Sequence, residues 1–319
     1  MTAPNYNRLP DAATARYLER INSVPSLPLD SLQPSVLRQA AKKARAHVAP
    51  VSPPILIARD LMAETASGTI AVRLFQPRPG MLPALIYFPG GGWVLGDLDT
   101  HDAMCRIIAN ESGCAVISVN YRKAPEHPFP AAVHDAIATL QWIASRAADF
   151  DVDARRLAVG GDSAGANLAT VAAMAIHAVG GCRFVWQLLL YPIVARPAVT
   201  GSYATYGRGY SLSAEAMRWF FEQYSPATLA HKVPDWWLTP STAPNLAGLP
   251  DTLVIVAGCD PLRDEGICYA RRLADAGVGV DLIEYHDQIH GFVNTGDAFP
   301  RAAEARSQIA AKLRAATAS

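Results

Sequence analysis

Gly161-Asp162-Ser163-Ala164-Gly165 sets the expected fold of this 319-residue chain. The run before it, Arg156-Leu157-Ala158-Val159-Gly160, is short and largely apolar, and predicts a strand. The alanine-rich run after it, residues 164–177, predicts a helix that ends before Gly180-Gly181. A serine between two glycines at a strand-to-helix turn is typical of a nucleophile elbow. Such a tight bend lifts the serine hydroxyl above the edge of a sheet.

Strand-like and helix-like segments alternate from about residue 55 onward. The later strands are near-continuous apolar runs, as expected for parallel strands that are covered on both faces. Eight strands with intervening amphipathic helices predict a mostly parallel α/β sheet flanked by helices. The expected strands are 55–62, 69–75, 84–88, 115–119, 157–160, 185–190, 252–257 and 280–285, and the expected helices are 102–111, 131–146, 164–177, 263–276 and about 301–313.

Two segments, residues 1–50 and 195–234, do not follow this alternation. The first has helical patterns around 12–21 and 34–47, and the second has one at 213–224 that begins at a good N-cap residue, Ser213. Both segments are apolar enough to pack on another surface. We expect them to form a helical cap over the carboxyl ends of the strands, where α/β sheets bind ligands. Residues 51–194 and 235–319 would then form the catalytic core as a single folding unit.

The composition excludes several function classes. Lys plus Arg and Asp plus Glu balance at 28 each and form no basic run, so neither a nucleic acid nor an anionic membrane surface is an expected partner. The five cysteines follow no C-x-x-C spacing, which favours a reduced, cytoplasmic protein without zinc. The first thirty residues lack an apolar signal-peptide region, and no run has the length of a transmembrane helix.

A serine nucleophile needs a base to remove its proton, and the base needs an acid to orient it. In enzymes built around such an elbow, the order along the chain is serine, acid, histidine. Asp260 directly follows the expected strand 252–257, whereas Asp251 lies at the opposite end of that strand. Asp264 and Glu265 fall in the next helix, where they would complement its dipole. Asp260 is therefore the predicted acid.

Two histidines, His286 and His290, follow the last expected strand. His286 is close enough to residues 280–285 to belong to the strand itself. His290 lies on the loop before the final helix and has room to reach Ser163, so it is the predicted base. Activity should fall in acid as this base becomes protonated. The remaining histidines are expected to be structural or surface groups: His47, His101, His127, His134, His177 and His231.

The sequence Phe88-Pro89-Gly90-Gly91-Gly92-Trp93 follows the expected strand 84–88. Consecutive glycines allow backbone N–H groups to converge on one point, as an oxyanion hole requires. A phosphate-binding loop is the alternative, but the Lys-Ser/Thr pair of a P-loop is absent. Gly91 and Gly92, with Ala164 after the nucleophile, are therefore the predicted oxyanion donors.

Together these motifs resemble the hormone-sensitive-lipase family of bacterial type IV esterases, which have the α/β-hydrolase fold. The resemblance spans nearly everything after residue 50. The matching motifs, in chain order, are Gly90-Gly91-Gly92-Trp93, residues 121–130 (Tyr-Arg-Lys-Ala-Pro-Glu-His-Pro-Phe-Pro), Gly161-Asp162-Ser163-Ala164-Gly165-Ala166-Asn167-Leu168, residues 260–266 (Asp-Pro-Leu-Arg-Asp-Glu-Gly) and His290-Gly291-Phe292.

The resemblance implies a catalytic triad of Ser163, Asp260 and His290 and an oxyanion hole formed by Gly91, Gly92 and Ala164. It also implies an eight-stranded α/β-hydrolase core with a helical cap, and a supporting role for residues 121–130. The implied activity is hydrolysis of short- to medium-chain carboxylic esters through an acyl-enzyme, with a small-molecule ester as partner and no cofactor or metal.

The sequence departs from the family pattern at two positions. Pro89 stands where the family has histidine, which should alter the geometry of the oxyanion loop without removing the amides of Gly91 and Gly92. Ala166 replaces a usual glycine, and the helix after the elbow should tolerate it.

Trp93 and Trp237 are candidates for lining the substrate pocket, with core packing as the alternative for the Trp236-Trp237 pair.

Two other functions fit the same fold. Receptor-like members bind a ligand without hydrolysing it and lack the triad histidine, which this sequence keeps at His290. Amidases or arylformamidases differ only in the leaving group, which the sequence does not determine. An edge strand at 280–285 is also a candidate pairing surface for a homodimer.

Overall fold

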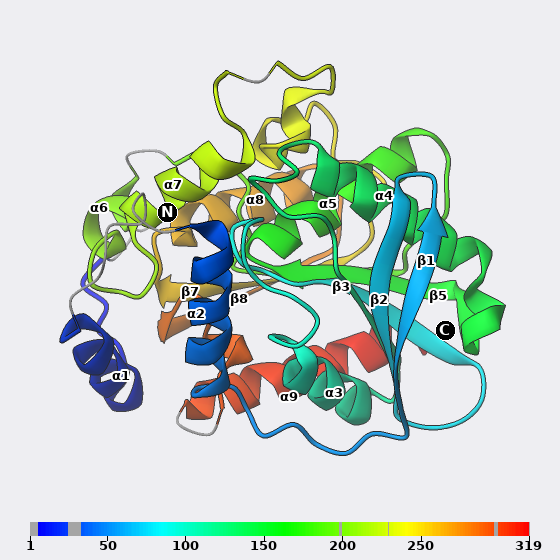
Figure 1. The fold of residues 1–319 in the computed structure, drawn as a ribbon, viewed down its shortest axis with the longest axis horizontal. Coiled ribbons are helices and arrows are strands. Elements are labelled where there is room, and N and C mark those ends of the chain that lie inside the picture. Colours follow the sequence, from blue (N-terminus) through cyan, green and yellow to red (C-terminus); the bar gives the residue numbers. More distant parts are fainter. Residues whose placement is uncertain (1–5, 25–32, 198–199, 229, 297–298, 319) are drawn as a thin grey trace.

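The computed structural model describes residues 6–24, 33–197, 200–228, 230–296 and 299–318. In this part of the chain, one eight-stranded sheet has the order β1-β2-β4-β3-β5-β6-β7-β8 (Figure 1). β1 and β2 form an antiparallel hairpin, β2 pairs antiparallel with β4, and the other neighbouring strands are parallel. The strands are β1 (Ile57–Thr65), β2 (Gly68–Gln76), β3 (Leu82–Phe88), β4 (Ala115–Val119), β5 (Val152–Asp162), β6 (Trp186–Leu190), β7 (Thr252–Cys259) and β8 (Val280–Ile289).

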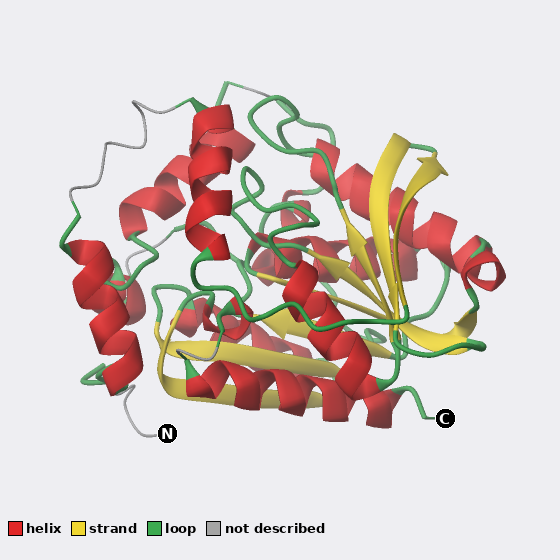
Figure 2. Cartoon of the chain, turned by 60° about the horizontal axis from the view of Figure 1, so that its bottom comes forward, coloured by secondary structure: helices red, strands yellow, loops and turns green. Residues whose placement is uncertain are grey.

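Helices cover both faces of the sheet, as Figure 2 shows from a second direction. α3 (Asp102–Ser112) and α9 (Pro300–Ala316) bury Met104, Ile108 and Ile309 against one face. α4 (Ala131–Ser145), α5 (Ala164–Ala178) and α8 (Arg263–Asp275) pack on the other. Every residue of β3, β4, β6 and β7 is buried, which explains why these strands are continuous apolar runs in the sequence. The predicted α/β-hydrolase architecture is confirmed.

Two strands extend furthest beyond the apolar runs that predicted them. β5 begins at Val152 rather than Leu157, and β8 continues to Ile289 rather than ending at Tyr285. The extension of β8 carries polar residues, including His286, Asp287 and Gln288, which hid it from a hydrophobicity pattern. It pairs Ile289 with Cys259 at the end of β7 after a shift in register.

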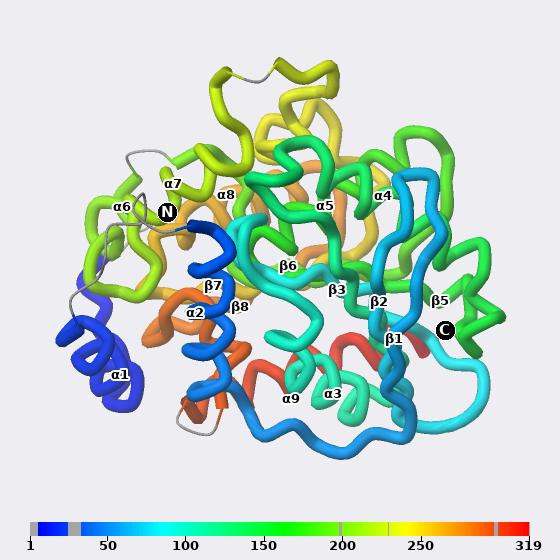
Figure 3. Tube along the Cα trace, in the orientation of Figure 1, coloured from blue at the N-terminus to red at the C-terminus, as the bar shows by residue number. Residues whose placement is uncertain are grey.

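The segments outside the sheet pattern lie together beyond one end of the strands (Figure 3). They form α1 (Ala12–Asn22), α2 (Pro34–Ala46), α6 (Gly201–Tyr206) and α7 (Ala214–Tyr224). The predicted N-cap of α7 is present, because the Ser213 side chain accepts from the amide of Ala216 at 3.0 Å. α6 was not predicted, since its six residues are too few to show a helical period.

Contacts tie these outer helices to each other and to the sheet. Leu18 of α1 is buried in a cluster with Tyr206 of α6 and with Cys259 and Ile289 at the ends of β7 and β8. Trp93, after β3, stacks on Tyr224 of α7 with ring centroids 4.3 Å apart. Among the described helices, none is long and apolar enough to cross a membrane.

Candidate active site

Ser163 occupies the sharp turn between β5 and α5. Its backbone angles, φ 55° and ψ −119°, are strained for a residue with a side chain, and they direct the chain from strand to helix in one step. Its amide donates to the carbonyl of Leu190 at 2.8 Å, which fixes the turn against β6. A Cβ on Gly165 would lie 1.8 Å from the carbonyl oxygen of Phe88. The close approach of β3 therefore explains why the elbow needs glycine there.

The predicted serine, histidine and aspartate form one hydrogen-bonded chain. His290 Nε2 lies 3.0 Å from Ser163 Oγ, and His290 Nδ1 lies 2.7 Å from Asp260 Oδ2. Asp260 is fully buried, and its other oxygen accepts from the amide of Leu262 at 2.9 Å. This arrangement suits a serine proton passing to Nε2 while the carboxylate holds the Nδ1–H tautomer.

The topology explains why Asp260 and His290 meet. β7 and β8 are parallel neighbours, and Cys259 pairs with Ile289 as the last pair of their ladder. The residues that follow this pair, Asp260 and His290, are the predicted acid and base, and they therefore lie at the same edge of the sheet. β6 lies between β5 and β7, so the elbow serine is two strands away from the acid.

Tyr191 is a supporting residue that the sequence analysis missed. Its ring centroid lies 4.7 Å from that of His290, and its amide donates to Ile255 at 2.6 Å. The side chain is buried, and its backbone φ is positive at 34°. Tyr191 packs directly against the imidazole and restricts its movement. Its place immediately after β6, at the catalytic edge, is the only sequence signal that pointed to it.

The glycine loop after β3 presents the expected oxyanion donors. Within the described residues, the amides of Gly91 and Gly92 have no hydrogen-bond acceptor. The amide of Ala164 lies at the start of α5, where N–H groups lack an intrahelical acceptor. Gly92 has φ 59°, and a Cβ there would lie 2.3 Å from the ring of Phe220 on α7. The loop is thus held closely against the outer helices.

Asp162, the residue before the nucleophile, holds this loop in place. Its Oδ1 accepts from the amide of Gly90 and from the hydroxyl of Tyr87, both at 2.8 Å. His101 Nε2 lies 3.1 Å from the same oxygen. Burial opposes ionisation of Asp162, but the charge of His101 and the hydrogen bonds hold its pKa at about 2. The sequence alone predicts no role for Asp162, although it lies within the elbow motif, and it predicts only a structural or surface role for His101.

The glycine loop that begins at Pro89 is held by hydrogen bonds from other residues. The hydroxyl of Tyr121 donates to the Pro89 carbonyl at 2.6 Å, and the amide of Ala124 donates to the carbonyl of Trp93 at 3.0 Å. Segment 121–130 therefore braces the loop at two points. Neither contact needs a side chain at position 89.

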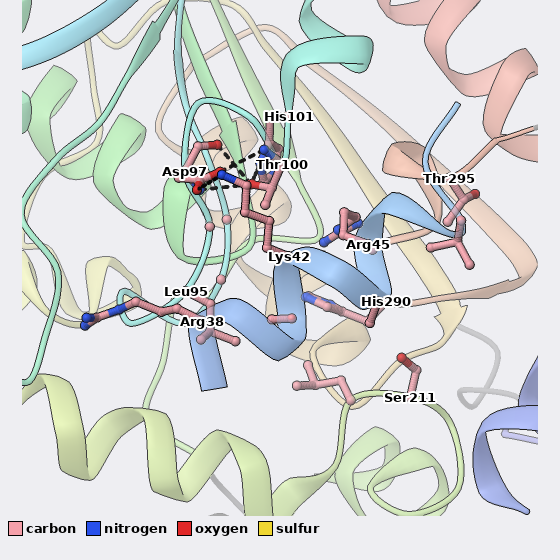
Figure 4. Close-up of a pocket in the computed structure, with 18 of the residues that line it drawn as sticks. Arg38, Lys42, Arg45, Leu95, Asp97, Thr100, His101, Ser211, His290 and Thr295 are labelled. Atoms are coloured by element: carbon pink, nitrogen blue, oxygen red, sulfur yellow. Dashed lines mark hydrogen bonds and ion pairs between the residues drawn. The ribbon is translucent and has the colours of Figure 1, made fainter. Parts of the chain in front are cut away.

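A cavity of about 720 Å³ opens beside His290 and Gly91. One wall is α2, which contributes Arg38, Lys42 and Arg45 (Figure 4). The loop before α7 contributes Ser211 and Leu212. Both segments that depart from the sheet pattern therefore line the same space as the predicted base.

The two predicted pocket tryptophans lie elsewhere. Trp93 is fully buried, between Tyr224 and Phe221, and is not among the residues that line this cavity. Trp237 packs at ring distance from His134, 5.4 Å away, and is also outside the cavity lining. The indole of Trp93 anchors the glycine loop to α7 instead.

The two acidic residues in the first turn of α8 do more than complement its dipole. Glu265 Oε1 accepts from the amide of Val194 at 2.9 Å, and burial raises the pKa of Glu265 to about 8. Asp264 accepts from the amide of Ser202 at 2.9 Å. Together they attach both ends of segment 194–202 to the core. Among the described residues, no group of three or more His, Cys, Asp or Glu side chains is placed to hold a metal ion.

Comparison with known proteins shows the family to which this chain belongs. Residues 85–294 match the model of a family described as having the alpha/beta hydrolase fold. The chain is 41% identical over 262 residues to the carboxylic ester hydrolase LipN of Mycobacterium tuberculosis, which covers 80% of this chain and 69% of LipN. It is 35% identical over 306 residues to an ethyl acetate hydrolase of Pseudomonas putida, covering 91% and 94% of the two chains.

The solved structures agree with the sequence comparison. The structure of an ester hydrolase from the metagenome of Lake Arreo, in complex with a bipyridine phosphonate derivative, superposes with a TM-score of 0.92 at 36% identity. The match covers 98% of this chain and all of that one.

Proposed function

The chain belongs to the α/β-hydrolase family, among its hormone-sensitive-lipase-like esterases, and is a carboxylic ester hydrolase; on that premise we propose that Ser163, His290 and Asp260 are its catalytic triad. The supporting observation is the hydrogen-bonded chain from Ser163 Oγ through His290 to Asp260, with contacts of 3.0 and 2.7 Å. The receptor-like alternative does not apply to an esterase.

In the first step, Ser163 Oγ attacks the ester carbonyl carbon while its proton moves to His290 Nε2. Asp260 keeps Nδ1–H pointing inward and stabilises the imidazolium. The amides of Gly91, Gly92 and Ala164 donate to the oxyanion of the tetrahedral intermediate. As this intermediate collapses, His290 gives its proton to the leaving alcohol.

In the second step, water attacks the acyl-enzyme carbonyl and gives one proton to His290. The second tetrahedral intermediate releases the carboxylic acid, and the proton on Nε2 returns to Ser163 Oγ. One water is consumed, and one acid and one alcohol are formed.

We propose that the preferred esters have short to medium acyl chains. A cavity of about 720 Å³ has room for a small ester. Because α2 forms one wall of this cavity, it limits the space for a long acyl chain. The relative from Pseudomonas putida, an ethyl acetate hydrolase, acts on such a small ester by its name.

A series of p-nitrophenyl esters tests this proposal. Acetate, butyrate, octanoate and laurate should give the highest kcat/KM at acetate or butyrate. Ser163→Ala should lower turnover about 10⁴-fold or more, by analogy with other triads, while keeping the wild-type circular dichroism spectrum. An optimum at laurate would contradict the chain-length proposal. Full activity in the alanine variant would contradict the triad.

Residues 1–50 and 195–234 are proposed to act as a cap on a core formed by 51–194 and 235–319. The support is that α2 and the loop before α7 line the cavity beside His290. Trp93 also stacks on Tyr224 of α7, and Gly92 lies close to Phe220 of the same helix. Deleting residues 1–50 should raise KM or shift chain-length preference, whereas an unchanged ester profile in a folded deletion variant would contradict a cap role.

A homodimer through the outer edge of β8 is also proposed. β8 ends the sheet, and Leu282 on it is an exposed apolar side chain. Light scattering should give twice the chain mass, and Leu282→Asp should lower it. A monomer at micromolar concentration would contradict this proposal.

The cytoplasm is the proposed compartment. All five cysteines are free in the structure, including the exposed Cys268, which is consistent with a reducing environment. Fractionation of the producing cells with an antibody should place the protein with cytoplasmic markers, and recovery outside the cytoplasm would contradict this.

A further inference from the structure

The cavity beside His290 is lined by more cationic than anionic side chains. Four of the lining residues are lysine or arginine, and two are carboxylates. The cations are Arg38, Lys42, Arg45 and Lys123, and the carboxylates are Asp97 and Glu126. An esterase that took only neutral, apolar esters would gain nothing from this excess of positive charge, because desolvating it opposes apolar binding.

Three of the four cations already have partners. Arg38 donates to both oxygens of Glu126 and to the carbonyls of Val94 and Ala124. Lys42 pairs with Asp97 and with Asp99. These two side chains are therefore neutralised by protein groups.

Lys123 is engaged in a different way. Its ammonium donates to the carbonyl of Tyr121 at 2.6 Å and lies 3.4 Å from the centre of that ring. Burial lowers the pKa of Lys123 to about 7, so it carries only part of a charge at neutral pH.

Arg45 is the exception. Its side chain is half-buried and lines the cavity, and within the described residues it has no hydrogen-bond acceptor, ion-pair partner or aromatic ring. Figure 4 shows Arg45, on α2, and His290 among the side chains that line this cavity. The planar guanidinium of an arginine is suited to bind a carboxylate through two parallel hydrogen bonds.

Arg45 also lies in the last turn of α2, where a cation stabilises the helix dipole. Lys43 shares that turn, but does not line the cavity. A role limited to the helix dipole would therefore be shared by both residues, whereas a role in substrate binding belongs to Arg45 alone. Lys43 is thus the matched control.

We propose that this enzyme prefers esters that carry a second, anionic group, and that Arg45 binds this group as a specificity-determining residue. The substrate class is the half-ester of a dicarboxylic acid or the acyl ester of a hydroxy acid, with the free carboxylate a few carbons from the reacting carbonyl. The inference rests on the proposed triad, because the cavity is a substrate site only if Ser163 is the nucleophile.

The test compares matched pairs of esters that differ only in charge. Monoethyl glutarate is compared with its amide, ethyl 5-amino-5-oxopentanoate, and 4-acetoxybutyrate is compared with 4-acetoxybutyramide. The first pair places the charge on the acyl side, and the second places it on the alcohol side. Hydrolysis is followed by product chromatography at pH 7.5 in low salt, for wild type, Arg45→Gln, Arg45→Lys and Lys43→Gln.

In the wild type, kcat/KM for the acid should exceed that for the amide by about tenfold in at least one pair, the scale of one charge-assisted contact of about 1.4 kcal/mol. Arg45→Gln should lower this acid-to-amide ratio to about one, Arg45→Lys should restore part of it, and Lys43→Gln should keep it. Raising salt to 0.5 M should reduce the wild-type ratio.

Two results would overturn the inference while leaving the esterase function intact. One is a wild-type ratio at or below one in both pairs together with hydrolysis of p-nitrophenyl butyrate. The other is an equal loss of ratio in Arg45→Gln and Lys43→Gln, which would show a general helix effect. Failure to hydrolyse any ester, p-nitrophenyl butyrate included, would instead overturn the proposed function and this inference with it.

Discussion

His290 of the proposed triad and helix α2 line the same cavity, but different forces hold the triad and the helix in place. Ser163, Asp260 and Tyr191 are buried. The amides of Ser163 and Tyr191 donate to carbonyls of β6 and β7 at 2.8 and 2.6 Å, and the Asp260 carboxylate accepts from the amide of Leu262 at 2.9 Å. α2 has no fully buried residue; Leu37 packs on the edge of the core, and ion pairs such as Arg38 with Glu126 and Lys42 with Asp99 also hold the helix.

This difference suggests that the buried residues at the strand ends determine the rate of the reaction, whereas the residues of α2 determine which substrate binds. A buried hydrogen-bonded group fixes the reacting atoms, and replacing it leaves an unpaired polar partner with no water to satisfy it. An exposed ion pair contributes only about 0.2–1 kcal/mol, so the charged residues of α2 can be substituted at little cost in stability. We therefore expect substitutions at the strand ends to lower kcat, and substitutions on α2 to alter KM or substrate preference.

The largest difference should come from two neighbouring acids. Asp260→Asn should lower kcat about 10³- to 10⁴-fold, because an amide at this position favours the wrong tautomer of His290. Asp264→Asn, which changes an acid one turn further along, should lose less than tenfold. Stopped-flow or steady-state assays with p-nitrophenyl butyrate measure both variants. Equal losses would show that the loop, rather than the contact to His290, matters.

A smaller but still clear effect is expected at Asp162. Asp162→Asn keeps an acceptor for Gly90 but loses the charge beside His101, and should lower kcat by about tenfold to a hundredfold, less than the loss of a whole oxyanion donor. The melting temperature should fall by about 5 °C, as expected for a buried charged contact in a domain of this size. Asp149→Asn, on the exposed surface, is the control, and it should change neither quantity.

The same residue makes a prediction about acid stability. The pKa of Asp162 is held at about 2, below its usual 3.8, so between these values the unfolded chain binds the proton and the folded chain does not. Stability from this group is present above about pH 4 and is lost as the pH falls toward 2. Thermal melts between pH 5 and 2 should therefore show a shallower decline for Asp162→Asn than for wild type. Parallel declines would contradict the assigned charge state.

Restoring the family histidine tests how far the brace from Tyr121 replaces it. Pro89→His should change kcat/KM several-fold at most, because the Tyr121 contact is to the backbone carbonyl at position 89 and the amides of Gly91 and Gly92 are retained. Activity toward p-nitrophenyl acetate is the measurement. Complete loss, or a thousandfold gain, would show that the side chain at position 89 governs the oxyanion loop.

The smallest effect is expected on the cap. Arg38→Ala should lower the melting temperature by about 2 °C, because the ion pair is half exposed, and should leave kcat within about threefold. Lys43→Ala, a cation of the same helix outside the cavity, is the comparison. If Arg38→Ala lowered kcat as much as Asp162→Asn, this would contradict the proposal that α2 affects substrate preference rather than the reaction itself.

The sequence predicted the core of this molecule well because its signals are local and apolar. The runs of β3, β4, β6 and β7 are buried on both faces. The elbow is bounded by Gly161 and Gly165, where a Cβ would clash with neighbouring backbone atoms. Chain order alone was enough to pair Asp260 with His290, because both follow parallel neighbouring strands.

The rest depended on contacts between distant residues. Tyr191 against His290, and Asp162 beside His101, join segments that no local pattern connects. The polar end of β8 is stabilised by pairing with β7 rather than by its own hydrophobicity. Trp93 is a large aromatic residue beside the glycine loop, which made it a candidate for lining the pocket. In the structure it stacks on Tyr224 and anchors this loop to α7, a contact that no local sequence pattern shows.

Covalent trapping of the nucleophile tests the central claim most directly. The enzyme is incubated with diethyl p-nitrophenyl phosphate, residual hydrolysis of p-nitrophenyl butyrate is followed, and the modified peptide is identified by mass spectrometry. We predict one diethylphosphoryl group per chain, on Ser163, with loss of activity in proportion to labelling and no labelling in Ser163→Ala. Inactivation with the label on another residue, or full activity with Ser163 labelled, would contradict the account.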